Sequence, residues 1–106
     1  METGTVVAML ITHAKAGSRE EWEAGVESIW KDAIGELQTN PGFKGLVTMW
    51  NDDDSGQVSV IGLWDNMEHR LAYEARSSGY VRGLFNGLFK QEPDRPRFLI
   101  SKAQLF

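Results

Sequence analysis

The sequence contains no cysteine, only three prolines and no long apolar run. The missing cysteine excludes disulfides, thiolate nucleophiles and cysteine-ligated metal sites. The longest apolar stretch near the start, residues 6–11, is too short for a membrane span, and no basic region precedes it as in a signal peptide. We therefore expect a cytoplasmic protein with no membrane partner.

The chain also has no concentrated basic segment. It carries 11 Lys and Arg against 15 Asp and Glu, for a net charge of −4. The basic residues are scattered, and only residues 90–97, "KQEPDRPR", gather several, together with acids. A nucleic-acid-binding protein normally presents a basic face, so we predict no nucleic-acid partner. No phosphate loop, nucleophile elbow or dinucleotide fingerprint is present either.

What the chain does have is the composition of an ordinary folded domain. Of its 106 residues, 42% are hydrophobic and 25% are charged. This length and balance predict one domain over residues 1–106 with a modest core.

The first third predicts a strand and then a helix. Residues 5–13, "TVVAMLITH", are apolar on both alternating faces, which is typical of a central strand covered on both sides. Ser18 and Glu21 have the spacing of a capping box, in which each side chain bonds the other's backbone amide. An apolar stripe at helical spacing then follows, formed by Trp22, Val26, Ile29, Trp30, Ala33, Ile34 and Leu37.

Glycine and proline mark the helix and its end. Gly25 and Gly35 each disfavour a helix, so we expect close packing against a neighbouring element at these positions. Asn40, Pro41 and Gly42 should end the helix, because proline cannot continue it and glycine lets the chain turn.

Two β-rich runs, residues 43–50 and 57–64, flank the turn cluster "NDDDSG" and predict an antiparallel hairpin. The three aspartates of the turn do not match an EF-hand, so a solvated turn is favoured over a calcium site. Alternation places the following residues on shared faces of the two strands: Phe43, Gly45, Val47 and Met49 on the first, and Val58, Val60, Gly62 and Trp64 on the second.

The last third predicts a second helix and a final strand. Asp65 and Asn66 are both good N-caps, and Glu68 could complete a capping box with Asp65. "SSG" at residues 77–79 should break or kink this helix, and residues 97–106 should form the last strand.

The resulting order, β-α-β-β-α-β, predicts an α+β fold of the ferredoxin-like type. Such a fold has a four-stranded antiparallel sheet with both helices on one face. The bare sheet face would also be apolar, which is a liability for a soluble monomer. We therefore expect a homodimer packed through the open sheet face, with Leu105 and Phe106 reaching toward the partner.

Several of these features together resemble the antibiotic biosynthesis monooxygenase-like family of the dimeric α/β-barrel superfamily. They are the opening strand with its capped helix, the helix exit "NPGF", the strand end "GLWDN" leading directly into a helix, and the basic passage containing proline before the last strand. The resemblance covers nearly the whole chain. It implies a small dimer with a pocket between sheet and helices in each subunit.

The resemblance also suggests where chemistry could occur. Trp64 matches the pocket tryptophan of active relatives, where it would stack on a planar substrate and donate a hydrogen bond; otherwise it is a core residue. Tyr73 could act as a general acid or orient a phenol, or be a half-buried helix residue. His13, at a strand end, could serve as a base or simply be exposed. His69 is a weak candidate for a haem iron ligand.

Three functions remain open from the sequence. The first is a cofactor-independent monooxygenase acting on a small aromatic, polyketide- or quinone-like compound, with no metal or other cofactor. The second is a non-catalytic, ligand-binding or structural dimer of the same fold. The third, haem binding or degradation, is disfavoured because the first strand lacks the asparagine, and Tyr73 replaces the histidine, of haem-degrading relatives.

Overall fold

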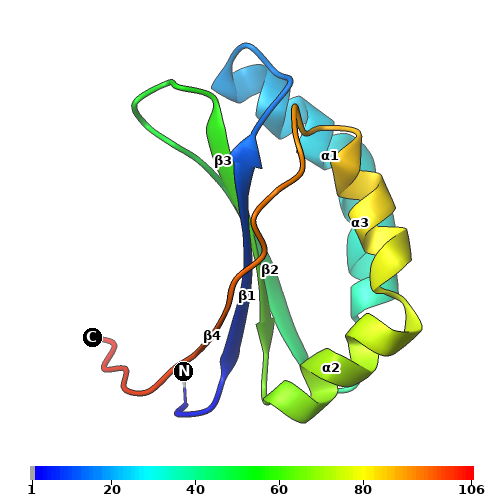
Figure 1. Cartoon of the computed structure of the whole chain (residues 1–106), viewed down its shortest axis with the longest axis vertical. Coiled ribbons are helices and arrows are strands. Elements are labelled where there is room, and N and C mark those ends of the chain that lie inside the picture. Colours follow the sequence, from blue (N-terminus) through cyan, green and yellow to red (C-terminus); the bar gives the residue numbers. More distant parts are fainter. Residues whose placement is uncertain (1) are drawn as a thin grey trace.

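The computed structural model describes residues 2–106 as one antiparallel sheet with three helices on one of its faces (Figure 1). The strand order is β2-β3-β1-β4, so the predicted ferredoxin-like α+β fold is confirmed. The helix predicted in the second half of the chain is split into two. The elements are β1 (Val6–His13), α1 (Arg19–Leu37), β2 (Phe43–Trp50), β3 (Gln57–Trp64), α2 (Met67–Arg76), α3 (Ser78–Asn86) and β4 (Arg97–Leu99).

The start of α1 follows the predicted cap in one half only. The Ser18 hydroxyl accepts from the Glu21 amide at 3.2 Å, as expected. The Glu21 carboxylate, however, accepts from the Gly17 amide at 3.0 Å, so the reciprocal bond to Ser18 is absent. Close packing is found at Gly25, where a Cβ would lie 2.9 Å from Leu88. Gly35 faces open space, so packing does not explain that glycine.

The "NPGF" exit ties the end of α1 to α2. The helix ends at Leu37, and the buried Asn40 side chain donates to the carbonyls of Glu36 and Leu37 at 3.0 and 3.3 Å. Its amide oxygen accepts from Arg76, at the last position of α2. This asparagine therefore satisfies carbonyls that a helix end leaves unpaired.

The hairpin of β2 and β3 forms as predicted, except for one shift of register. An irregularity between Phe43 and Gly45 places Phe43 on the helix side, together with Leu46 and Trp50. The expectation that Phe43 shares a face with Val47 and Met49 is therefore wrong, because the extra residue of the bulge reverses the alternation. The predicted face of β3 is confirmed at its three large residues, which are buried: Val58, Val60 and Trp64.

The second helical region begins and breaks near the predicted residues. Asn66 is the N-cap of α2 and accepts from the His69 amide at 2.9 Å. Asp65 instead accepts from His69 Nδ1 at 2.7 Å, so the proposed capping box of Asp65 and Glu68 does not form. The chain leaves helical geometry at Ser77, between α2 and α3.

The last strand is much shorter than predicted. β4 spans Arg97–Leu99, although the chain already runs beside β1 before it, with Met9 N donating to Pro96 O and Ile11 N to Asp94 O. Prolines 93 and 96 lack the amide hydrogen that a regular ladder needs. Residues 101–106 form no strand and are exposed. None of the helices within residues 2–106 is long and apolar enough to cross a membrane.

The two faces of the sheet differ in what covers them. Alternate residues of β1 face α1 and α3 and are buried, and the others are only partly covered. On the uncovered face Val7 pairs with Phe98, which is 54% exposed, and Val47 and Met49 of β2 are also exposed. The expectation of an apolar open face is thus met in the single chain.

Gly42 is the turn residue whose replacement should be most disruptive. Its φ is +82°, and a Cβ there would overlap Asp65 and His69. We expect Gly42→Ala to lose about 1–2 kcal/mol from left-handed strain, plus at least about 1 kcal/mol from the displaced Asp65–His69 bond. Urea unfolding measures the loss.

Gly56→Ala is the matched control for this prediction. Gly56 has φ +87° but open space around it, so only the backbone strain should appear. Equal losses in the two variants would contradict the tight contact at the start of α2.

Candidate functional site

Trp64 is the last residue of β3 and is completely buried. Its ring meets Phe43 edge-on with centroids 5.3 Å apart. On another side it stacks on Tyr73 of α2, with centroids 4.9 Å apart and an angle of 29° between the rings. Contacts of this kind add about 0.5–1.5 kcal/mol beyond area burial. The stack therefore fixes α2 against the end of the sheet.

The indole of Trp64 carries a polar group that this packing does not satisfy. Nε1 is buried and has no hydrogen-bond partner among the described residues. A Cβ on Gly62 would lie 3.3 Å from Nε1, so the absence of a side chain at Gly62 leaves room beside the donor. An unpaired buried donor typically costs about 1–3 kcal/mol, and an acceptor that reached this N–H would remove that cost.

A cavity of about 90 Å³ lies between the helix side of the sheet and the α2–α3 pair. Its apolar floor includes Trp64, Tyr73, Val81 and Phe85, all of which are buried. Its other lining group is a set of charged side chains, which we name the arginine rim: Arg70, Arg82, Arg95 and Arg97. No carboxylate or imidazole among the described residues lines this cavity.

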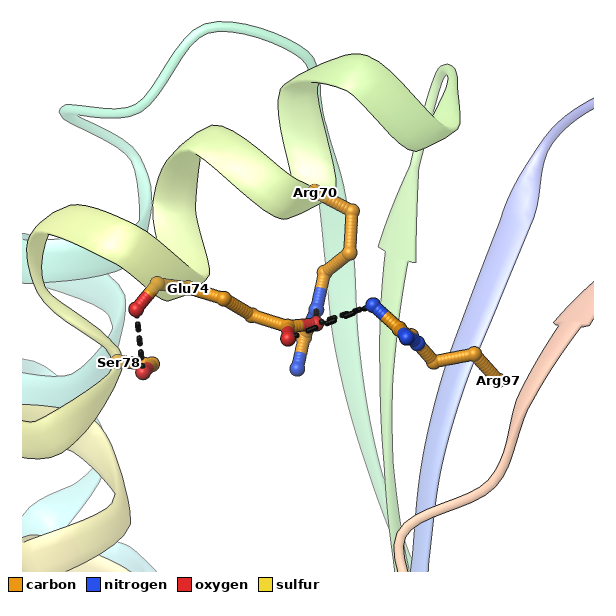
Figure 2. A network of polar contacts seen from close by, with 4 residues as sticks. All are labelled: Arg70, Glu74, Ser78 and Arg97. Atoms are coloured by element: carbon orange, nitrogen blue, oxygen red, sulfur yellow. Dashed lines mark hydrogen bonds and ion pairs between the residues drawn. The ribbon is translucent and has the colours of Figure 1, made fainter.

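Two of the four arginines of the rim form ion pairs with the same carboxylate. Glu74 accepts from Arg70 Nε at 2.7 Å and from Arg97 Nη1 at 3.2 Å (Figure 2). The Ser78 hydroxyl, at the start of α3, donates to the backbone carbonyl of Glu74 at 3.0 Å. Partial burial acts to raise the pKa of Glu74, but the Arg70 hydrogen bond and the positive charges of Arg70 and Arg97 hold that pKa below its ordinary value. Glu74 therefore joins α2 to β4 as a carboxylate.

Arg70 also lies over the aromatic stack. Its guanidinium carbon is 5.8 Å from the centroid of Trp64 and 5.1 Å from that of Tyr73. Both distances are within cation–π range. The guanidinium thus places a fixed positive charge beside the rings against which a planar ligand would lie.

The environment of Tyr73 keeps its hydroxyl neutral. Burial raises the pKa of Tyr73, and the nearby charges of Arg70 and Arg82 offset this only in part. A phenol with a raised pKa is a proton donor at neutral pH rather than a base. Tyr73 can therefore donate a hydrogen bond or a proton in this cavity.

The other two arginines of the rim, Arg82 and Arg95, have no ion-pair partner within residues 2–106. The half-buried Arg82 and Arg95 form no salt bridge there, and the one side-chain contact of Arg95 is to Asn86, at 3.5 Å. Burial lowers the pKa of Arg95, and the neighbouring charge of Arg82 lowers it further. Two partly desolvated cations thus face one cavity without a paired anion.

The structure brings Trp64 and Tyr73 together but leaves His13 elsewhere. Val6 pairs with Trp64 across β1 and β3, whereas His13 pairs with Gln57 at the opposite end of the same strands. Seven residues of extended strand separate the two positions, about 23 Å. His13 lines a different, polar cleft with Lys15 and Lys90.

His69, the remaining candidate, and two further tryptophans also lie outside the cavity at Trp64. His69 is bonded through Nδ1 to Asp65 and does not line it. Trp22 stacks on Phe89 in the core, and Trp50 donates to Asp54 in the hairpin loop at 3.0 Å. No cluster of three or more potential metal ligands occurs among the described residues.

The arginine rim is the functional feature that the sequence analysis missed. Its members come from α2, α3, the passage before β4 and the start of β4 itself, and only the fold collects them. Two signals were present. Arg70 and Glu74 have the spacing of a helical ion pair, and Arg95 and Arg97 lie in the basic passage already noted for the resemblance.

The likeness to known structures lies in the fold. No protein-family model matches the sequence, and a comparison with curated proteins finds no relative. A mutant form of SnoaB, a cofactor-independent oxygenase from Streptomyces nogalater, superposes with a TM-score of 0.69 at 15% identity, over 94% of this chain and 96% of that one. A protein from Bordetella bronchiseptica, named as a candidate antibiotic biosynthesis monooxygenase, gives 0.67 at 13% identity, over 97% and 99%.

A conserved protein from Methanosarcina mazei, whose description states no activity, is equally similar. Its TM-score is 0.67 at 12% identity, over 91% of this chain and 92% of that one. The predicted resemblance to antibiotic biosynthesis monooxygenases is therefore confirmed at the level of fold. At these identities the site must be argued from its own residues.

The raised pKa of Tyr73 predicts a loss of stability at high pH. Above pH 10 the unfolded chain releases this proton while the folded chain retains it, so the free energy of unfolding falls until the folded pKa is passed. We expect Tyr73→Phe to remove this component, so that the variant loses less stability than the wild type between pH 9 and 11. Urea unfolding across this range measures it.

Tyr80→Phe controls for the loss of a phenol as such. Tyr80 is the other tyrosine of the chain and is about half exposed on α3. Its variant should follow the wild-type pH profile. A Tyr73→Phe profile identical to that of wild type would contradict the desolvated environment.

Proposed function

We propose that this protein is a cofactor-independent monooxygenase that oxidises a small aromatic compound in the cavity at Trp64. The observation that carries the proposal is the buried Nε1 donor of Trp64, which has no partner within the described chain and belongs to a residue that lines the cavity. An oxygen atom on a bound aromatic would satisfy it. The fold shared with SnoaB, described as a cofactor-independent oxygenase, supports the proposal by analogy.

The cavity lining suits a substrate that ionises by itself. No carboxylate or imidazole of the described chain lines the cavity to remove a proton, whereas guanidinium groups there would stabilise an anion. An activated ring CH₂ group beside a carbonyl can lose a proton to give a delocalised anion. Arg70, over the aromatic stack, would lower the pKa of such a substrate.

The reaction balances without an added reductant. The substrate anion supplies the electrons to dioxygen, one oxygen atom bonds to the ring carbon, and both of that carbon's C–H bonds break. The other oxygen atom leaves as water, so that R₂CH₂ and O₂ give R₂C=O and H₂O. Neutral Tyr73 would donate a proton to the departing oxygen and recover one from the substrate. Trp64 would hold the carbonyl oxygen through Nε1.

The size of the cavity favours a second candidate function. A volume of about 90 Å³ is smaller than the roughly 150 Å³ of an engineered apolar cavity that binds a single benzene ring. A ligand larger than one ring must therefore extend beyond it, and a non-catalytic, small-ligand-binding dimer of the same fold would need no more space. Haem is far larger than this volume, and His69 does not line the cavity.

We further propose that the protein is a homodimer joined through the open sheet face. Val7, Met9 and Ile11 of β1 lie on this face beside exposed residues of β2 and β4. A second copy packed there would remove this apolar surface from water. Leu105 and Phe106, which are exposed in the single chain, would lie near the partner.

Oxygen consumption tests the catalytic proposal. The protein is incubated with anthrone and with hydroxylated anthrones in an oxygen electrode, and the ketone product is quantified. We expect turnover by the wild type and a roughly 100- to 10,000-fold lower kcat for Tyr73→Phe, about the contribution of one positioned acid. This variant keeps the ring that stacks on Trp64.

Tyr80→Phe should retain wild-type turnover, because Tyr80 is exposed and does not line the cavity. If saturable binding occurs without oxygen uptake for any substrate, the non-catalytic function is favoured. Equal activity of the two tyrosine variants would remove Tyr73 from the mechanism.

The dimer is tested by sedimentation equilibrium at micromolar concentration. We expect a mass of two chains for the wild type and of one chain for the double variant Val47→Glu, Met49→Lys, which places charges on the open face. Leu71→Glu is the control, since Leu71 is similarly exposed but lies on α2. A wild-type mass of one chain would refute the dimer.

A further inference from the structure

The arginine rim contains more positive charge than the protein itself balances. Four of the six arginines of the chain line the one cavity at Trp64, in a protein of net charge −4. No acidic residue among those described lines it. The cations are thus gathered at the cavity, whereas the excess acids lie elsewhere.

We propose that the ligand of this cavity is an aromatic carboxylic acid, whose carboxylate binds Arg82 and Arg95 while its ring lies against Trp64 and Tyr73. The inference deepens the proposed function and rests on it, because it concerns the same cavity and names the class of substrate.

The paired and unpaired arginines have different roles in this assignment. Arg70 and Arg97 share the Glu74 carboxylate, which offsets one of their two positive charges and occupies a hydrogen-bond donor of each. Arg82 and Arg95 have no carboxylate within ion-pair distance in the described chain, and the charge of Glu92 acts on Arg95 without forming an ion pair. The incoming anion would supply the missing partner for these two groups.

The cost of holding these cations together supports a ligand-binding role. The partial burial of Arg95 disfavours its charged form, as does the charge of Arg82. Desolvation and repulsion between like charges both destabilise the unliganded protein. A bound carboxylate would relieve both, because a guanidinium fork forms two parallel, charge-assisted hydrogen bonds to it.

The position of the rim matches the shape of such a ligand. Trp64, Tyr73 and Phe85 form a buried apolar floor, whereas Arg82 and Arg95 are half-buried and therefore lie toward solvent. A single ring fills a cavity of about 90 Å³, so an acidic substituent would project toward the rim. The Nε1 donor of Trp64 would bind an oxygen at the inner end of the same ligand.

Isothermal titration with matched pairs of compounds tests the inference. The probes are 4-hydroxybenzoate and 6-hydroxy-2-naphthoate, each compared with its methyl ester at pH 7.5. We expect each acid to bind at least about tenfold more tightly than its ester, as one charge-assisted contact provides. Raising the salt concentration from 50 to 500 mM should weaken binding of the acids and leave that of the esters nearly unchanged.

Variants assign the effect to the two unpaired arginines. Arg82→Gln and Arg95→Gln should each reduce affinity for the acid about tenfold and change that for the ester by less than twofold, and Arg95→Lys should restore part of the loss. Arg19→Gln is the control, because Arg19 is exposed on α1 and pairs with Glu23 there. Thermal melting verifies that every variant is folded.

Failure of this inference differs from failure of the proposed function. Equal binding of acid and ester would overturn the inference and leave a neutral-substrate monooxygenase standing. Acid-selective binding lost in both arginine variants, with no oxygen uptake by any substrate, would support the inference and refute the catalysis. Absence of binding by all four probes would overturn the inference together with a ligand site at Trp64.

Discussion

The stack of Trp64 on Tyr73 is the contact on which the rest of the site depends. It joins the end of β3 to the middle of α2, and both residues are buried. Because Tyr73 is held there, the turn of helix that contains Arg70 and Glu74 is fixed over the sheet, and Glu74 can reach Arg97 on β4. The cavity lies between these contacts and the sheet. Moving the stack would therefore change the shape of the cavity and the charge of its rim together.

The same stack explains why an unsatisfied donor can persist at Trp64. Leaving Nε1 unpaired costs about 1–3 kcal/mol. Burial of the indole offsets a cost of this size, since a large side chain contributes roughly 1.5–3 kcal/mol on full burial. Rotating the ring to pair Nε1 would give up the contacts with Phe43 and Tyr73. A buried, unpaired donor is thus the lower-energy arrangement in the single chain.

Local sequence pattern was sufficient for much of the fold and insufficient at specific points. Element order, the helix stop at Asn40 and the break near Ser77 followed from caps, glycine and proline, which act over a few residues. The face of Phe43 did not, because a bulge in β2 depends on pairing with β3. The short length of β4 has a local cause that we did not weigh enough in the sequence: two prolines interrupt the pairing of this segment with β1.

Some residues of the candidate site could likewise be predicted from the sequence, and others could not. Trp64 and Tyr73 could be singled out through the resemblance to a known family, and the structure stacks them. His13 could not be placed relative to them until β1 was paired with β3, which sets the two ends of the sheet apart. The arginine rim depends on three elements meeting, so no local spacing could reveal it.

The charge of the whole chain gives little guidance to the charge of its cavity. The net −4 arises mainly from acids spread over exposed helix and loop surface, where water screens them. Arg82 and Arg95 are half-buried, so their field is screened less and acts mainly on what enters the cavity. An acidic protein can therefore present a strongly cationic binding site. The net charge and the lack of a basic segment describe the whole chain, whereas a small anionic ligand would meet only the positive charge that lines the cavity.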